Sequence, residues 1–159
     1  MVTRKELLGL GVFLALSFSA AAIGGLAMRG GPGAWYADLV KPSWTPPGWL
    51  FGPVWTLLYI MMAVAAWRVW RQDGLAGARP ALALFLVQLV LNAAWTPIFF
   101  GLHRPGWAFA EICVLWAAIA ATSGAFFAKS ILAGALMIPY LVWVSFAAAL
   151  NFAIWRANP

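Results

Sequence analysis

The chain has 159 residues, a formal net charge of +6, a hydrophobic content of 65% and a charged content of 9%. A soluble domain is about half apolar and about a quarter charged, so this chain has too little polar surface for a water-soluble globule. Its basic residues stand singly or in pairs between apolar runs, which argues against nucleic-acid binding. Because the sequence has one cysteine, Cys113, and one histidine, His103, it predicts no disulfide and no metal site.

Five apolar segments are each long enough to cross a bilayer, for which about 20 residues are needed. These segments cover residues 7–28, 49–67, 81–102, 105–128 and 131–155. They are rich in alanine and leucine and lack the alternation of a β-barrel strand, so helices are indicated. The sequence therefore predicts an all-α integral membrane protein, in which residues 1–159 form a single five-helix bundle in the lipid bilayer.

The first segment bears on targeting and orientation. Arg4 and Lys5 precede it, as in a signal peptide, but its apolar stretch exceeds the about 7–15 residues typical of one. We therefore expect an uncleaved first helix. With five spans, six basic residues share a side with the N-terminus and four lie on the other, which favours a cytoplasmic N-terminus.

The long connection between the first two segments, residues 29–48, reads RGGPGAWYADLVKPSWTPPG. It has too much glycine and proline to continue a helix, and its aromatic residues Trp35, Tyr36 and Trp44 would be costly to leave in water. We expect an ordered loop that folds back over one end of the bundle. The alternative is an aromatic belt at the membrane interface, where Trp67, Trp70 and Trp155 at span ends are also expected as anchors.

Polar and aromatic residues recur at helical spacing in the inner segments. The residues that share faces are Trp55 with Tyr59, then Gln88, Asn92 and Trp95, and lastly Tyr140, Trp143, Ala147 and Asn151. The amides should point into the bundle, because polar groups are costly to expose to lipid. Such faces suit a flat, largely apolar ligand, but interhelical hydrogen bonding and tight aromatic packing would explain them equally well.

Several runs in the chain resemble those of one family. They are WYxxLxKPSWTPP from Trp35, GPxW from Gly52, QxxxNxxWxPxFFG from Gln88, Trp107 with the acid Glu111, and PYxxW from Pro139 leading to Leu150-Asn151. In order and spacing they are similar to the TspO/translocator protein family, the tryptophan-rich sensory proteins once called peripheral benzodiazepine receptors. The resemblance covers essentially the whole chain.

The resemblance implies a pocket beneath the first loop that binds porphyrins or other tetrapyrroles, and synthetic isoquinoline or benzodiazepine-type ligands. It implies no cofactor beyond porphyrin as a ligand, and a protein that is often a homodimer. Phe152 occupies the tyrosine position of the weak sterol-associated pattern, which favours a bacterial, tetrapyrrole-type member over a sterol binder. Carried over, the ligand-binding residues are Tyr36, Trp55, Tyr59, Asn92, Trp95, Trp107, Tyr140, Trp143 and Ala147.

Four functions remain open at this point. The first is a receptor, sensory or transport protein for porphyrins. The second is enzyme-like, light-dependent porphyrin degradation that would use Trp55 and Trp143 as redox-active groups. The third is a small proton-coupled exporter, which would need an acid inside a span, and Glu111 is the acid available. The fourth is a structural scaffold without a saturable ligand.

Small residues are spaced so that helices could approach closely. They are Ala21 and Gly25 in the first segment and Ala117, Ala121 and Ala125 in the fourth. This small-xxx-small spacing suits a homodimer interface, and it equally suits packing within the bundle. The sequence does not choose between these two roles.

Overall fold

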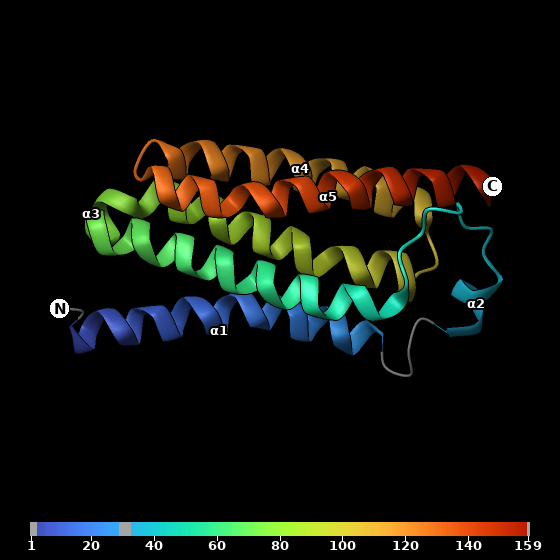
Figure 1. The fold of residues 1–159 in the computed structure, drawn as a ribbon, viewed down its shortest axis with the longest axis horizontal. Helices are drawn as coiled ribbons and strands as arrows, with labels where there is room; N and C mark the ends of the chain where they lie inside the picture. Colours follow the sequence, from blue (N-terminus) through green and yellow to red (C-terminus); the bar gives the residue numbers. More distant parts are fainter. Residues whose placement is uncertain (1–2, 29–32, 159) are drawn as a thin grey trace.

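The computed structural model describes residues 3–28 and 33–158, and every regular element in these ranges is helical. The elements are α1 (Arg4–Ala27), α2 (Gly33–Asp38), η1 (Gly48–Leu50), α3 (Phe51–Thr96), η2 (Pro97–Gly101), α4 (Pro105–Phe127) and α5 (Ile131–Ala157). η1 is a short 3₁₀ turn and η2 a π-helical turn. Figure 1 shows the long helices side by side, with α2 and the C-terminus at the end opposite the N-terminus.

The longest helix, α3, consists of two antiparallel limbs joined at Gly74 (Figure 1). Gly74 has φ 65° and ψ −177°, a conformation open essentially to glycine alone. The limbs, residues 51–73 and 75–96, match the predicted spans 49–67 and 81–102, but both continue to Gly74 instead of leaving a loop. Four helices of the described chain are long and apolar enough to cross a membrane, and α3 supplies two crossings. The predicted all-α membrane bundle is confirmed.

We call the end of the bundle that contains Gly74 the closed end. Two ion pairs fasten it: Arg71 Nε to Glu6 Oε1 at 2.8 Å, and Lys129 Nζ to Asp73 Oδ2 at 2.6 Å. Arg71 and Asp73 both lie on the first limb of α3, while their partners lie on α1 and on the α4–α5 connection. One stretch of α3 is therefore tied to two neighbouring parts of the bundle.

Apolar packing in the same half is dense. Phe13 of α1 packs against Trp70 and Phe85, with ring centroids 6.2 Å and 6.1 Å away. Trp67 is only 9% exposed, and its indole N–H donates a hydrogen bond to the carbonyl oxygen of Glu6 at 2.7 Å. The expectation that Trp67 is an interfacial anchor is therefore wrong, because α1 covers that face of α3.

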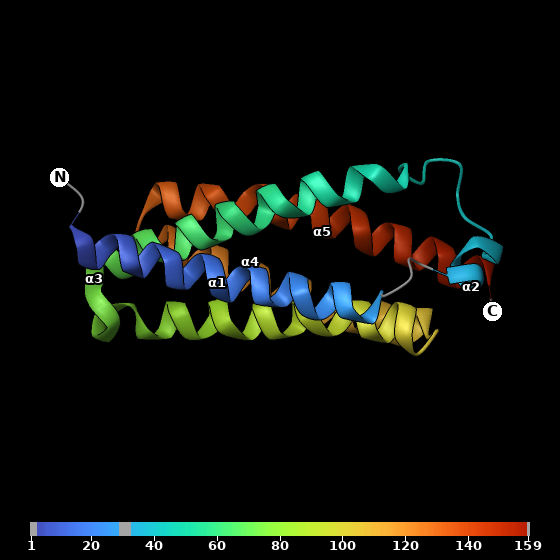
Figure 2. The ribbon, with the colours of Figure 1, turned by 90° about the horizontal axis from the view of Figure 1, so that it is seen from below.

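The two limbs of α3 diverge as they leave the closed end, as Figure 2 shows. They are farthest apart at the opposite end, where α2 lies, and we call this the lid end. α4 and α5 pack on each other and on α3, whereas α1 packs on α3 and η2.

Candidate ligand-binding site

A cavity of about 790 Å³ occupies the lid end. Its walls come from α1, both limbs of α3, η2, α4 and α5, and residues of the first loop cover its mouth. The sequence-predicted residues that line it are Tyr36, Trp55, Tyr59, Asn92, Trp95, Trp143 and Ala147. The structure thus brings seven of the nine residues to one chamber, and their contact with a ligand stays a prediction.

The other two residues, Tyr140 and Trp107, are not on the cavity wall. Tyr140 is fully buried behind it and meets the wall residue Trp55 edge-on, with ring centroids 6.0 Å apart. Trp107 is 74% exposed on the outer side of α4. The predicted place of Trp107 in the pocket is therefore corrected, since the inward face of α4 is set by Ala108, Ile112 and positions one turn further on.

A chain of hydrogen bonds crosses the inner end of the cavity. Tyr59 Oη donates to Asn92 Oδ1 at 2.7 Å, and Asn92 Nδ2 donates to Tyr140 Oη at 2.9 Å. Tyr140 Oη donates in turn to Gln88 Oε1 at 3.0 Å. The amides point inward as predicted, and they link both limbs of α3 to α5. The Asn92 side chain therefore both lines the cavity and links the helices of the bundle through its hydrogen bonds.

A second polar link lies nearer the lid. Trp95 Nε1 donates to Asn151 Oδ1 at 3.0 Å, and Asn151 Nδ2 donates to the carbonyl oxygen of Pro105 at 2.8 Å. The Trp95 ring also stacks on Phe99, with centroids 5.0 Å apart and 21° between the planes. The indole of Trp95 is thus fixed in orientation, so that its ring presents a fixed apolar surface to the cavity.

Trp143 differs from Trp95 because its indole nitrogen is buried without a hydrogen-bond partner among the described residues. Its ring is held between Phe51 and Phe146, at centroid distances of 5.8 Å and 5.6 Å. An unpaired buried donor costs about 1–3 kcal/mol.

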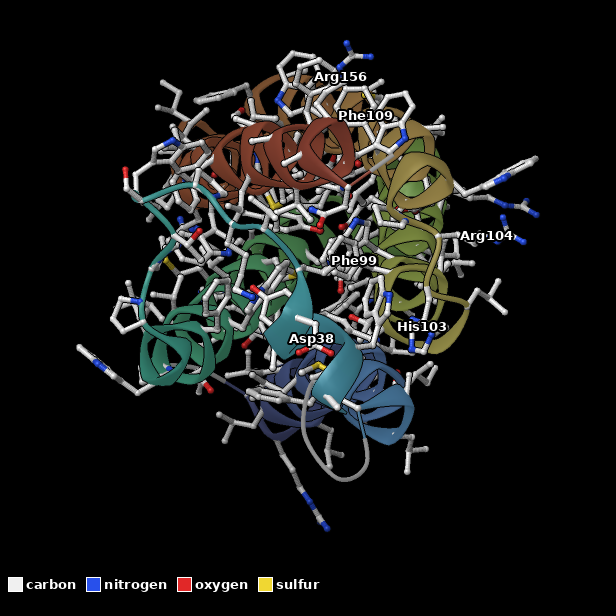
Figure 3. All side chains as sticks on the ribbon, turned by 90° about the vertical axis from the view of Figure 1, so that its right-hand side faces the viewer. Asp38, Phe99, His103, Arg104, Phe109 and Arg156 are labelled. Atoms are coloured by element: carbon white, nitrogen blue, oxygen red, sulfur yellow. The ribbon has the colours of Figure 1, made fainter. Side chains whose placement is uncertain are left out.

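Residues 33–47, which we call the lid, cover the cavity with an ordered chain, as predicted for the long loop. Trp35 stacks on His103, with centroids 4.3 Å apart and an interplanar angle of 17°, and meets Phe99 edge-on at 5.7 Å. Figure 3 looks onto this end and shows Phe99 near the middle of the bundle and His103 at its side. Trp44 packs against Phe146 at 5.7 Å but stays 48% exposed. Residues 29–32 lie outside the described ranges.

Lys41 holds the lid in shape. Its ammonium group donates to the carbonyl oxygens of Tyr36, Leu39 and Ala37 at 2.6, 2.9 and 3.1 Å, and lies 4.7 Å from the centre of the Tyr36 ring. Burial raises the pKa of the Tyr36 phenol, which stays neutral at physiological pH. Among the described residues that line the cavity, Lys41 is the one with a charged side chain. The site is therefore largely apolar with one positive charge at its mouth.

The similarity to known proteins extends over nearly the whole chain. The model of the TspO/MBR family matches residues 12–156. The chain belongs to this family. It is 46% identical to Protein CrtK of Rhodobacter capsulatus, over 80% of this chain and 81% of that protein. It is 45% identical to the human translocator protein, over 78% of this chain and 75% of that protein. It is 44% identical to a tryptophan-rich sensory protein of Cereibacter sphaeroides, over 92% of this chain and 89% of that protein.

Sequence reasoning missed one wall of this TspO/MBR cavity. The missed wall consists of small residues of α1, Ala20, Ala21, Gly24 and Gly25. From the sequence, Ala21 and Gly25 suited either a dimer interface or packing within the bundle. In the structure both residues line the chamber. A side-chain carbon added at Gly25 would meet no atom within 4 Å, so the space beside this glycine is open.

The acid of α4 lies outside the TspO/MBR cavity. Glu111 does not line the chamber, whereas its neighbour Ile112 does. Both carboxyl oxygens of Glu111 are buried without a hydrogen-bond partner in the described parts of the chain. The carboxyl group of Glu111 therefore pairs with no other side chain in the described bundle.

Proposed function

We propose that this TspO/MBR protein binds porphyrins and related flat, largely apolar ligands in the lid-end cavity, as a membrane receptor or sensory protein. The observation that carries the proposal is the chamber itself, about 790 Å³ in volume, walled by Trp55, Trp95 and Trp143 and covered by the lid. Cavities that hold small ligands are about 300–1,000 Å³ and mostly apolar. Flat indole faces suit a flat conjugated ligand.

Charge supports a ligand with carboxylates, as protoporphyrin has. Lys41 lies at the cavity mouth, and no acidic side chain pairs with it in the described ranges. Its bonds go to backbone carbonyls, so its positive charge is not neutralised. A ligand with an apolar ring and acidic edges would match both the chamber and its mouth.

A titration with protoporphyrin IX tests the proposal, with tryptophan fluorescence quenching as the readout. We expect saturable quenching by the wild type and about tenfold weaker binding by Trp143→Ala, which removes a large buried aromatic surface. Trp107→Ala is the matched control, because it also deletes one tryptophan but from the outer face. Absence of saturation in the wild type would instead favour a structural scaffold.

A second candidate, light-dependent porphyrin degradation, is favoured by one observation. Trp55 and Trp143 both line the cavity, and Trp55 lies beside Tyr59, with ring centroids 5.5 Å apart. Absorbance of the protoporphyrin complex under illumination separates the two candidates. Bleaching no faster than that of free porphyrin, or equal bleaching by Trp143→Phe and wild type, would count against degradation by these residues.

A further inference from the structure

Asn158, the residue after α5, is joined to the lid by a reciprocal pair of hydrogen bonds. The backbone N–H of Val40 donates to Asn158 Oδ1 at 3.0 Å, and Asn158 Nδ2 donates to the carbonyl oxygen of Val40 at 3.0 Å. The side-chain amide thus pairs with both backbone groups of one residue, as a neighbouring strand would. The two residues are 118 positions apart in the sequence.

The same side chain is also anchored to α5. Asn158 Nδ2 donates a second hydrogen bond to the carbonyl oxygen of Ile154 at 2.8 Å, and Ile154 lines the cavity. Both hydrogens of the amide nitrogen are thereby used, which fixes the side chain against the last turn of the helix. Asn158 therefore connects the lid to a helix that forms part of the cavity wall.

On the lid side, Val40 lies directly before Lys41, whose ammonium group holds the carbonyls of Tyr36, Ala37 and Leu39. Tyr36 and Lys41 both line the cavity. Fixing the backbone of Val40 therefore also fixes two of the four lid residues that line the chamber. The Val40 side chain is 61% exposed, so this attachment depends on hydrogen bonds rather than on apolar burial.

The other attachments of the lid are of a different kind. Apart from the turn bond between the Leu50 N–H and the Pro47 carbonyl oxygen, where the lid enters α3, Asn158 makes the hydrogen bonds that join residues 33–47 to the helical bundle in the described chain. Its other contacts with the bundle are apolar: Trp35 packs on His103 and Phe99, Tyr36 packs on Phe99 and Phe100, and Trp44 packs on Phe146. Aromatic contacts permit sliding, whereas a reciprocal amide pair fixes register. Opening of the lid near Tyr36 must therefore break the pair between Val40 and Asn158.

We propose that Asn158 is a positioning residue of the ligand site, a latch that keeps Tyr36 and Lys41 over the cavity and limits how fast a bound ligand leaves. The proposal rests on the proposed function for its ligand, and protoporphyrin IX is the probe. Loss of two hydrogen bonds corresponds to about a tenfold change in rate.

Two measurements on the full chain in lipid nanodiscs test the latch. The first is hydrogen exchange at the Val40 amide, and the second is the dissociation rate of protoporphyrin IX. In Asn158→Leu, which keeps the size but removes the polar groups, we expect both rates to rise about tenfold. Asn158→Asp keeps the acceptor for the Val40 N–H and loses the donors, so exchange and dissociation should lie between those of Asn158→Leu and wild type.

Gln72→Leu is the matched control, because it removes a side-chain hydrogen bond to the Lys129 carbonyl oxygen at the closed end. It should leave both rates unchanged. Unchanged Val40 exchange in Asn158→Leu would overturn the latch, and faster exchange with unchanged dissociation would overturn its role toward the ligand. If the wild type does not bind protoporphyrin, the proposed function and the ligand role fail together, and Val40 exchange alone still decides whether Asn158 holds the lid.

Discussion

The two ends of the bundle are built in opposite ways. At the closed end, the limbs of α3 meet at Gly74, and two ion pairs and the Trp67 indole fasten α3 to its neighbours. At the lid end the limbs diverge, aromatic rings line a chamber, and hydrogen-bonded amides cross between helices (Figure 2). The difference teaches that the closed end contributes to stability alone, whereas the lid end combines stabilising hydrogen bonds with the proposed binding site, so a closed-end substitution should change stability without changing affinity.

The largest expected effect is at the lid end, where Asn92→Leu breaks the hydrogen-bond chain. The hydroxyl of Tyr59 loses its acceptor and that of Tyr140 loses a donor, and buried polar groups without partners cost about 1–3 kcal/mol each. We expect the free energy of unfolding to fall by about 3 kcal/mol and porphyrin affinity to fall with it. Chemical denaturation in detergent measures the first effect, and quenching titration the second.

Ser145→Ala is the control for this prediction. Ser145 Oγ accepts a hydrogen bond from Trp116 Nε1 at 2.8 Å, which also joins two helices, α4 and α5, but lies on the exposed surface. Its loss should cost no more than about 1 kcal/mol. If Asn92→Leu and Ser145→Ala lowered the free energy of unfolding equally, the inner chain of hydrogen bonds would stabilise the fold no more than the surface hydrogen bond does.

The next effect belongs to the closed end. A side-chain carbon on Gly134 would lie 2.2 Å from a ring atom of Phe127, so Gly134→Ala forces the Phe127 side chain of α4 out of its place against α5. Overpacking of this kind costs about 1–3 kcal/mol. We expect the thermal midpoint to fall while the porphyrin affinity of the folded protein stays at the wild-type value.

Gly124→Ala tests whether the steric contact is the cause, because a carbon added at Gly124 would meet nothing within 4 Å. That variant should keep the wild-type midpoint or raise it, since alanine favours a helix by about 1 kcal/mol over glycine. A loss of porphyrin affinity in folded Gly134→Ala would break the separation of the two ends.

The smallest expected effect is the electrostatic one at the cavity mouth. Lys41→Met should weaken protoporphyrin IX binding up to about tenfold, because the ligand carboxylates lose their charged neighbour. Lys129→Met, which removes the same charge at the closed end, should not change affinity. Binding of the porphyrin dimethyl ester, measured in parallel, should weaken less than that of protoporphyrin IX, because Lys41→Met also removes the three hydrogen bonds that hold the lid. Equal weakening of both ligands would assign the whole effect to the lid.

Much of the fold could be predicted from sequence because lipid restricts the choices. Apolar length predicted five crossings, and the cost of polar groups in lipid placed Gln88, Asn92 and Asn151 inside the bundle. The single-residue reversal at Gly74 was missed, because hydropathy detects polar stretches and the polar residues beside Gly74 are helical. The burial of Trp67 was missed because the sequence does not show that α1 packs over the face of α3 on which Trp67 lies.

The cavity wall was predicted where helical spacing and motif agreed, as for Trp55 with Tyr59 and Trp143 with Ala147, and ligand contact at these residues stays a prediction. It was mispredicted at Trp107, where a motif was present but the inward face of the helix is one residue further along. The contacts of Asn158 left no periodic signal, since a residue after the last helix belongs to no face. Such contacts between distant segments become visible only in three dimensions.

The single glycine between the limbs of α3 has a consequence for how the chain enters its membrane. A connection of one residue gives the second limb no slack to remain in water after the first has inserted. We expect residues 51–96 to be integrated as one helical hairpin during biogenesis. The tip of this hairpin carries three cations, Arg68, Arg71 and Arg79. They would then all cross the membrane or all remain on the side from which the hairpin inserts, so that one insertion event sets the orientation of two spans.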